Sequence, residues 1–93
     1  MRAEAVFTVL NSRLRRTMLT LLCKKDMTAS EIFRELGSSA PSYRQSINKA
    51  LEAMKESGLL SKYYDDSRKA LEYHLNTKKL ILDLEKMQVR EPD

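Results

Sequence analysis

The stretch from Ser42 to Leu60 has the clearest periodicity in the chain and constrains the fold more than any other segment. Apolar residues recur there at positions i, i+4, i+7, i+8 and i+11, which is the spacing of one buried stripe on an α-helix. The stripe consists of Tyr43, Ile47, Ala50, Leu51 and Met54. Gly58 follows where many helices end in a left-handed residue. The sequence therefore predicts one long helix that supplies much of a core.

The opposite face of this helix is polar. At about 100° per residue, it carries Ser42, Gln45, Asn48, Lys49 and Glu52. The amide, hydroxyl and ammonium groups of its first two turns are those that bond base edges and phosphates in a DNA major groove. A solvated face of an ordinary helix has a similar composition, so this helix alone leaves both interpretations open.

The length and composition of the chain favour one small domain inside the cell. A chain of 93 residues with a hydrophobic fraction of 42% can bury one modest core. No apolar run approaches the ~20 residues of a membrane span. Arg13, Arg15 and Arg16 interrupt the apolar N-terminal segment, unlike a signal peptide. The net charge of +4 permits an anionic partner without requiring one.

The chain has a single cysteine, Cys23, which excludes an internal disulfide and any multi-cysteine zinc site. Its neighbours Leu21 and Leu22 favour a buried thiol that acts as a small hydrophobic residue. A redox-active thiol and an intersubunit disulfide stay open as alternatives.

Three shorter helices are predicted before the long one. Apolar residues at helical spacing mark two of them, over residues 2–10 and 13–23. The third begins with a capping box, in which the Thr28 hydroxyl accepts from the Glu31 amide and the Glu31 carboxylate accepts from the Thr28 amide. This helix is expected to end at Gly37.

A short turn joins the third helix to the long one. It contains Pro41, which suits the first turn of a helix, and either Ser39 or Ser42 can serve as the N-cap. Two helices joined by a short turn, with polar residues early in the second, follow a helix-turn-helix plan.

After Gly58 the apolar period changes from 3.6 residues to 2, which predicts strands over residues 60–65 and 71–75. A charged turn between them makes a β-hairpin whose tip carries Arg68 and Lys69. Because an isolated hairpin is only marginally stable, it is expected to pack on the helices.

The last segment has the pattern of a further helix. Asn76 is a natural N-cap, and apolar residues follow at helical spacing: Leu80, Ile81, Leu84 and Met87. We therefore expect a C-terminal helix over residues 77–88.

In this order, four motifs resemble the winged helix-turn-helix transcription regulators, most closely the ArsR-like group. They are Leu14–Leu19 (LRRTML), Thr28–Gly37 (TASEIFRELG), Asn48–Leu60 (NKALEAMKESGLL) and Tyr73–Leu75 (YHL). They look like that group's entry to the second helix, scaffold helix, recognition helix with its exit, and wing-closing strand. The resemblance covers roughly residues 5–88. It implies one domain over residues 1–93, mainly α with a small β-hairpin, in the order α-α-α-α-β-β-α.

The resemblance also implies a homodimer. Members of the group usually dimerise through the first and last helices, and the residues that fit this role are Val6, Phe7, Leu10, Leu80, Leu84 and Met87. The alternative is that both helices pack only within one chain.

Many ArsR-like proteins bind a metal through cysteines on the third helix or through His and Asp pairs on the last one. Residues 28–36 of this chain have no Cys or His, and residues 77–88 have no His. His74 lies in a predicted strand, where a polar surface residue is expected. We therefore expect no metal and no cofactor.

The resemblance implies a sequence-specific regulator of transcription, a repressor, that binds double-stranded DNA as a cytoplasmic, nucleoid-associated homodimer without a membrane partner. The long helix would enter the major groove, and the wing would meet the backbone or the minor groove. The candidate DNA contacts are Ser42, Arg44, Gln45, Ser46, Asn48, Lys49, Arg68 and Lys69.

A winged-helix module that binds protein instead of DNA is the alternative function. Such a module should expose an apolar patch on its recognition face, and Gln45, Asn48 and Lys49 supply none. We expect no enzymatic activity, because the sequence has no nucleophile with an adjacent base and no Gly-rich phosphate loop.

Overall fold

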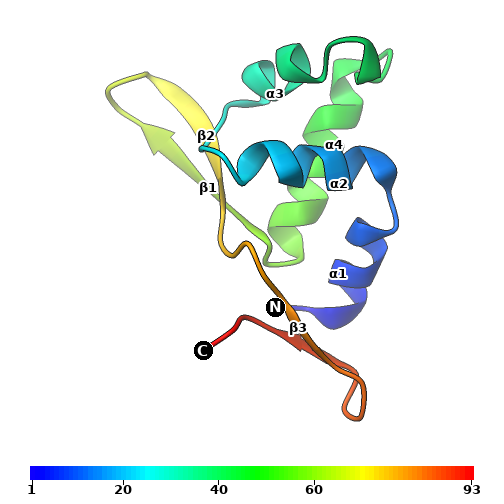
Figure 1. The fold of residues 1–93 in the computed structure, drawn as a ribbon. Coiled ribbons are helices and arrows are strands. Elements are labelled where there is room, and N and C mark those ends of the chain that lie inside the picture. The colour runs from blue at the N-terminus through cyan, green and yellow to red at the C-terminus, as the bar shows by residue number, and fades with distance from the viewer.

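The computed structural model describes residues 1–93 and contains four α-helices and two antiparallel β-hairpins (Figure 1). The helices are α1 (Ala3–Leu10), α2 (Arg13–Leu22), α3 (Ala29–Leu36) and α4 (Arg44–Glu56), and a 3-10 turn, η1 (Gly37–Ser39), follows α3. The first hairpin joins β1 (Leu60–Asp65) to β2 (Ala70–Leu75), and the second joins β3 (Ile81–Asp83) to β4 (Gln88–Arg90). The protein is therefore a small α+β fold. The four helices and the first hairpin lie where the sequence periodicities predict them.

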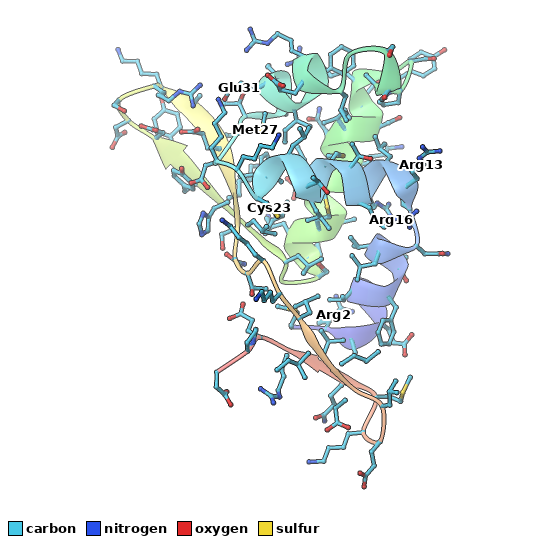
Figure 2. All side chains as sticks on the ribbon, viewed as in Figure 1. Arg2, Arg13, Arg16, Cys23, Met27 and Glu31 are labelled. Carbon is cyan, nitrogen blue, oxygen red and sulfur yellow. The ribbon has the colours of Figure 1, made fainter.

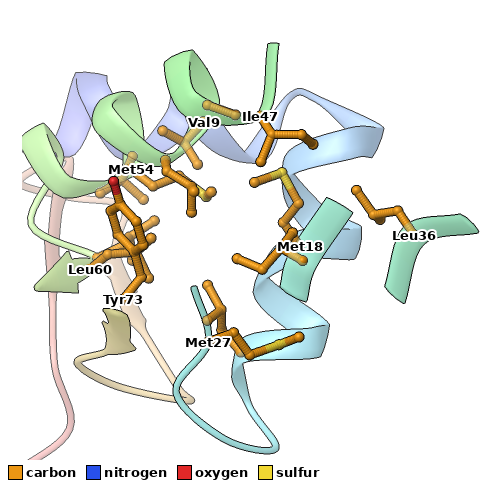
Figure 3. Close-up of a cluster of buried hydrophobic side chains, with 14 residues drawn as sticks. Val9, Met18, Met27, Leu36, Ile47, Met54, Leu60 and Tyr73 are labelled. Atoms are coloured by element: carbon orange, nitrogen blue, oxygen red, sulfur yellow. The ribbon is translucent and has the colours of Figure 1, made fainter. Parts of the chain in front are cut away.

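One cluster of 14 buried apolar side chains joins the helices to the first hairpin (Figure 3). Helix α4 supplies four of them, which are Ile47, Ala50, Leu51 and Met54. Full burial of an aliphatic side chain of this size contributes roughly 1.5–3 kcal/mol. The predicted stripe on α4 is therefore a main source of the fold's stability. None of the helices has the length and apolarity needed to cross a membrane.

The N-terminus of α4 departs from the prediction in two ways. Tyr43 is the N-cap residue, with extended backbone angles (φ −116°, ψ 129°), and neither Ser39 nor Ser42 caps the helix. The side chain of Tyr43 is exposed (72%), so it does not belong to the buried stripe. Ala40, before Pro41, and Tyr43 both have extended backbone angles, so the helix begins only at Arg44.

The predicted helix ends at the two glycines are confirmed. Gly37 and Gly58 have φ of +53° and +92°, in the left-handed region that only glycine adopts at no steric cost. A Cβ on Gly58 would also lie 3.3 Å from the Met1 Cα. The capping box of α3 is complete, with both the Thr28 and Glu31 side chains bonded to backbone amides.

The first hairpin is anchored to the helices through its inner strand. Strand β2 pairs with β1 from Leu60–Leu75 to Asp65–Ala70. On its other edge, the backbone groups of Tyr73 exchange two hydrogen bonds with those of Met27, at 2.8 and 3.2 Å. Tyr73 itself is 5% exposed. Strand β2 is therefore paired with β1 along its length and is bonded to Met27 at one residue on its other edge.

The prediction of a C-terminal helix over residues 77–88 is wrong, because this segment forms most of the β3–β4 hairpin (Figure 1). Leu82 of β3 stands opposite Val89 of β4, and Val89 packs against the core. The turn is held by Asp83, whose Oδ1 accepts the Lys86 N–H at 3.0 Å. Met87 has φ +50°, which interrupts any right-handed helix.

Candidate nucleic-acid interface

The first two turns of α4 present polar side chains to solvent. Arg44, Gln45, Asn48 and Lys49 are exposed, and Ser42 is exposed just before the helix. Ser46 is half-buried. The stretch from residue 36 to residue 51 contains no Asp or Glu, so no carboxylate from this part of the chain offsets the two cations. This face can therefore accept an anion and also offer amide groups for hydrogen bonding.

Arg44 connects the start of α4 to α3. Its guanidinium donates to the Ser30 hydroxyl and lies 5.9 Å from the centroid of the Phe33 ring. A guanidinium over an aromatic face gains cation–π attraction. The side chain is therefore placed at the junction of α3 and α4 and does not point straight out from α4.

The N-terminus of α4 has no side-chain cap. Of its first amide groups, the Ser46 amide donates a hydrogen bond to the Tyr43 carbonyl at 3.1 Å. The amides before it donate to no backbone carbonyl of the preceding turn. Uncapped amides at a helix N-terminus favour a phosphate group, because the helix dipole adds to their hydrogen bonds. This property adds to the anion preference of the exposed face.

The tip of the first hairpin is fixed to α3 by Arg68. The Arg68 guanidinium contacts a Glu31 carboxylate oxygen at 2.9 Å and a Glu72 oxygen at 2.8 Å. Glu31 lies on the side of α3 that faces the hairpin (Figure 2). The hydrogen bond to Glu31, followed by the attraction of both carboxylates, raises the pKa of Arg68 above its ordinary value. Arg68 therefore holds the hairpin against α3.

The turn of this hairpin is organised by Asp65. Its Oδ1 accepts from the Ser67 hydroxyl at 2.7 Å, the Ser67 amide at 2.9 Å and the Arg68 amide at 3.3 Å. The Ser67 hydroxyl, then the neighbouring Glu72 carboxyl, and then the two backbone amides lower the pKa of Asp65 to about 2. Lys69 follows with φ +52°, is exposed and makes no ion pair. Lys69 is therefore the free cation at the tip.

A polar cluster on the first hairpin has no local sequence pattern that would predict it. The Tyr63 hydroxyl donates to Asp26 Oδ2 at 2.6 Å, and His74 Nδ1 lies 2.8 Å from Asp26 Oδ1. The bond to Asp26 raises the pKa of Tyr63 to about 12. Partners 37 and 48 residues apart leave no local pattern in a single sequence. His74 is otherwise exposed, as expected for a polar surface residue.

The residues proposed for a dimer interface lie in different environments. Val6 has no exposed surface, so its side chain belongs to the core of one chain. The predicted interface is corrected at this residue. Phe7 and Leu10 are half-buried on α1. Leu80 is half-buried against the core, while Leu84 and Met87, on the turn of the second hairpin, are exposed.

Cys23 is half-buried and lines a small apolar cavity of about 130 Å³ together with Leu19 and Leu80. Its predicted role as a small hydrophobic residue fits these neighbours. Across the structure, no group of three or more His, Cys, Asp or Glu side chains is placed to hold a metal ion.

The structure thus exposes Gln45, Asn48 and Lys49 on one face of α4 and directs Arg44 to the junction with α3. Lys69 lies at the tip of the first hairpin, where Arg68 is already engaged by two carboxylates. No protein-family model matches the chain, and no curated protein sequence matches it. A functional proposal therefore depends on the chemistry of this surface.

Proposed function

We propose that the protein is a sequence-specific, double-stranded DNA-binding transcription regulator of the winged helix-turn-helix type. The observation that carries the proposal is the two-sidedness of α4. Gln45, Asn48 and Lys49 are exposed on turns that Ile47, with no exposed surface, fixes in the core. Reading a groove requires hydrogen-bonding side chains on a rigid support, and α4 has that arrangement.

The proposed base contacts come from the amide side chains. Gln45 and Asn48 can each bond adenine bidentately through its N6 and N7. Lys49 is one turn from Gln45 and serves guanine or a phosphate. Ser42, Ser46 and Arg44 lie near the uncapped N-terminus of α4, where phosphate contacts are proposed.

The first hairpin takes the part of the wing. Lys69, exposed and unpaired at its tip, is the proposed contact with the DNA backbone or minor groove. Arg68 is already held between Glu31 and Glu72, so its proposed role is to position the tip. Phosphate contacts of this kind make binding strongly dependent on salt.

A homodimer is part of the proposal. Two α4 helices related by a two-fold axis would meet two half-sites about one DNA turn, or ~34 Å, apart. The proposed DNA site is therefore pseudo-palindromic. A dimer bound at a promoter would block transcription, so the proposed regulator is a repressor.

The test is a selection of bound sequences from random DNA duplexes, followed by titration of the selected site at several salt concentrations. Gln45→Ala and Asn48→Ala should relax the sequence preference, because each removes a base contact. Lys49→Ala should weaken binding and reduce the salt slope if its contact is a phosphate, by about 1. Lys55→Ala, on the C-terminal half of the same helix, removes the same charge and is the control. It should change neither the sequence preference nor the salt slope.

One pair of results would exclude DNA reading by α4. If no sequence is enriched and low-salt affinity is the same for wild type, Gln45→Ala and Asn48→Ala, then α4 is not a DNA-reading helix. An unchanged free energy of unfolding in these exposed-residue variants would show that the comparison concerns binding and not folding.

A further inference from the structure

The second hairpin exposes an unusual amount of apolar surface. Nine large hydrophobic side chains are exposed in the whole chain, and four of them lie in a seven-residue stretch of this hairpin: Ile81, Leu82, Leu84 and Met87. Concentrated apolar exposure on a small protein marks an interaction surface more often than scattered apolar residues do.

The hairpin is also incompletely paired. Strand β3 has β4 as its only strand neighbour, so its other edge offers free backbone N–H and C=O groups. Strand β4 is the one that packs against α1, through the half-buried Val89. A two-stranded sheet with one anchored strand is marginal by itself and gains stability from a further strand.

The charges around β3 are complementary to themselves in an antiparallel arrangement. Two lysines, Lys78 and Lys79, precede the strand, and two carboxylates, Asp83 and Glu85, end or follow it. Pairing of this segment with an identical copy running the other way brings the lysines of each chain to the carboxylates of the other. A parallel arrangement would place like charges together, which is destabilising.

We propose that β3 pairs with β3 of a second copy of this chain, about a two-fold axis at Ile81, so that the two hairpins form one four-stranded antiparallel sheet. In this register Leu80 stands opposite Leu82 of the second copy, and Lys79 stands opposite Asp83 of the second copy. Each apolar pair and each ion pair occurs twice, as a two-fold interface requires. The contact uses the exposed side chains of Lys79, Ile81 and Leu82, and it includes the half-buried Leu80, which also packs against the core.

The inference rests on the homodimer of the proposed function, and it names the surface that forms it. It does not depend on DNA binding. Lysines beside an edge strand can also act as guards that prevent pairing, and this alternative predicts a monomer whose state is insensitive to the charge of residue 79.

The experiment measures the dimer dissociation constant of the full chain by sedimentation equilibrium without DNA, up to millimolar concentration. Wild type should dimerise. Lys79→Glu should raise the dissociation constant roughly tenfold or more, because two ion pairs become two like-charge contacts. Lys86→Glu makes the same change of charge in the turn, outside the paired segment, and should have little effect.

Mixing two variants tests the register itself. Lys79→Glu and Asp83→Lys should each self-associate weakly, whereas their equimolar mixture should form heterodimers more tightly than either variant forms homodimers, because every facing pair is then of opposite charge. Asp83 also holds the turn, so Asp83→Asn, which keeps an acceptor oxygen, serves as the milder variant and should weaken the dimer less.

A measurement on wild type avoids reliance on any variant. In a mixture of differently isotope-labelled chains, NMR should detect contacts between the Ile81 side chains of the two copies. A monomer at millimolar concentration, or a dimer unaffected by Lys79→Glu and without Ile81 contacts, overturns the inference. A dimer that selects no DNA contradicts the proposed function alone.

Discussion

The two β-hairpins of this protein have similar local chemistry but different support. In the first, β2 pairs with β1 on one edge and bonds Met27 through Tyr73 on the other, and Tyr73 is buried in the core. In the second, the paired strands have three residues each, and contact with the helices depends mainly on Leu80 and Val89. The stability of each hairpin therefore depends on which side chains and backbone groups cover its strands. Strand pattern alone does not decide it.

The difference also separates two functions. The first hairpin is fixed to α3 by Arg68, so its tip can hold a cation in a defined place. The second keeps apolar residues and one strand edge free, so it can hold a partner. One hairpin is stabilised within the chain, and the other is stabilised, under our proposal, by a second chain.

The largest expected effect separates the two hairpins by their cores. Tyr73→Ala should lower the free energy of unfolding by about 3–5 kcal/mol, because it leaves a cavity among buried side chains. Leu82→Ala, at a half-exposed position of β3, should cost under about 1 kcal/mol in the monomer. Urea unfolding at a concentration below dimerisation measures both.

Tyr73→Phe is the control for that comparison. It keeps the ring and removes a hydroxyl that lies a long 3.4 Å from Glu52 Oε1, so it should cost about 1 kcal/mol or less. Equal losses for Tyr73→Ala and Leu82→Ala would show that the two hairpins are equally integrated into the fold.

Hydrogen exchange should sharpen the comparison along the backbone. In the dilute monomer, the Tyr73 amide, which donates to the Met27 carbonyl at 2.8 Å, should exchange at least about ten times more slowly than amides of β3 and β4. At dimer-forming concentration, amides of β3 should gain protection. Equal protection of both hairpins in the monomer contradicts the difference in support.

A smaller effect distinguishes the two basic residues at the first hairpin's tip. Arg68→Ala should lower the melting temperature, because the buried Glu72 carboxylate loses its cation. Lys69→Ala should leave the melting temperature unchanged, because Lys69 makes no ion pair, and should instead weaken DNA binding evenly across sequences. The reverse pattern would make Arg68 the DNA contact and Lys69 the structural residue.

The smallest effect is a dependence on acid. The pKa of Asp65 is about 2 in the folded protein and 3.8 ordinarily, so the folded state binds fewer protons. Its contribution to stability is full above about pH 4 and is lost as the pH falls towards 2. Asp65→Asn should flatten thermal stability across this window. An unchanged pH profile would mean that the turn and the Glu72 carboxyl together do not favour the charged form of Asp65 over its form in water.

Much of the helical part could be read from local sequence. The capping box of Thr28 and Glu31, the two terminal glycines and the buried stripe of α4 each depend on residues a few positions apart, where backbone geometry dictates the contact. The polar face of α4 follows from the same periodicity. Tyr43 departs from the stripe because it is the extended N-cap residue and the helix begins after it.

The ion pair between Arg68 and Glu31 at the hairpin tip could not be predicted. Arg68 and Glu31 are 37 positions apart, and no pattern in the sequence links a turn residue to the capping residue of another helix. Only the packing of the hairpin against α3 brings them within 2.9 Å. The same holds for Asp26 and its partners Tyr63 and His74.

The sequence by itself determined where the chain is helical between residues 3 and 56, where two glycines end helices, and which face of α4 is polar. Tertiary structure decided the fate of residues 77–88. Leu80, Leu82 and Leu84 alternate with period 2, while Leu80, Ile81 and Leu84 also have helical spacing, so the pattern allows both structures. The hairpin is the structure adopted here, and the contact that favours it is tertiary: Val89 packs on the core beside α1, more than 75 positions away in the chain. The turn bond between Asp83 and Lys86 is local and accompanies this packing.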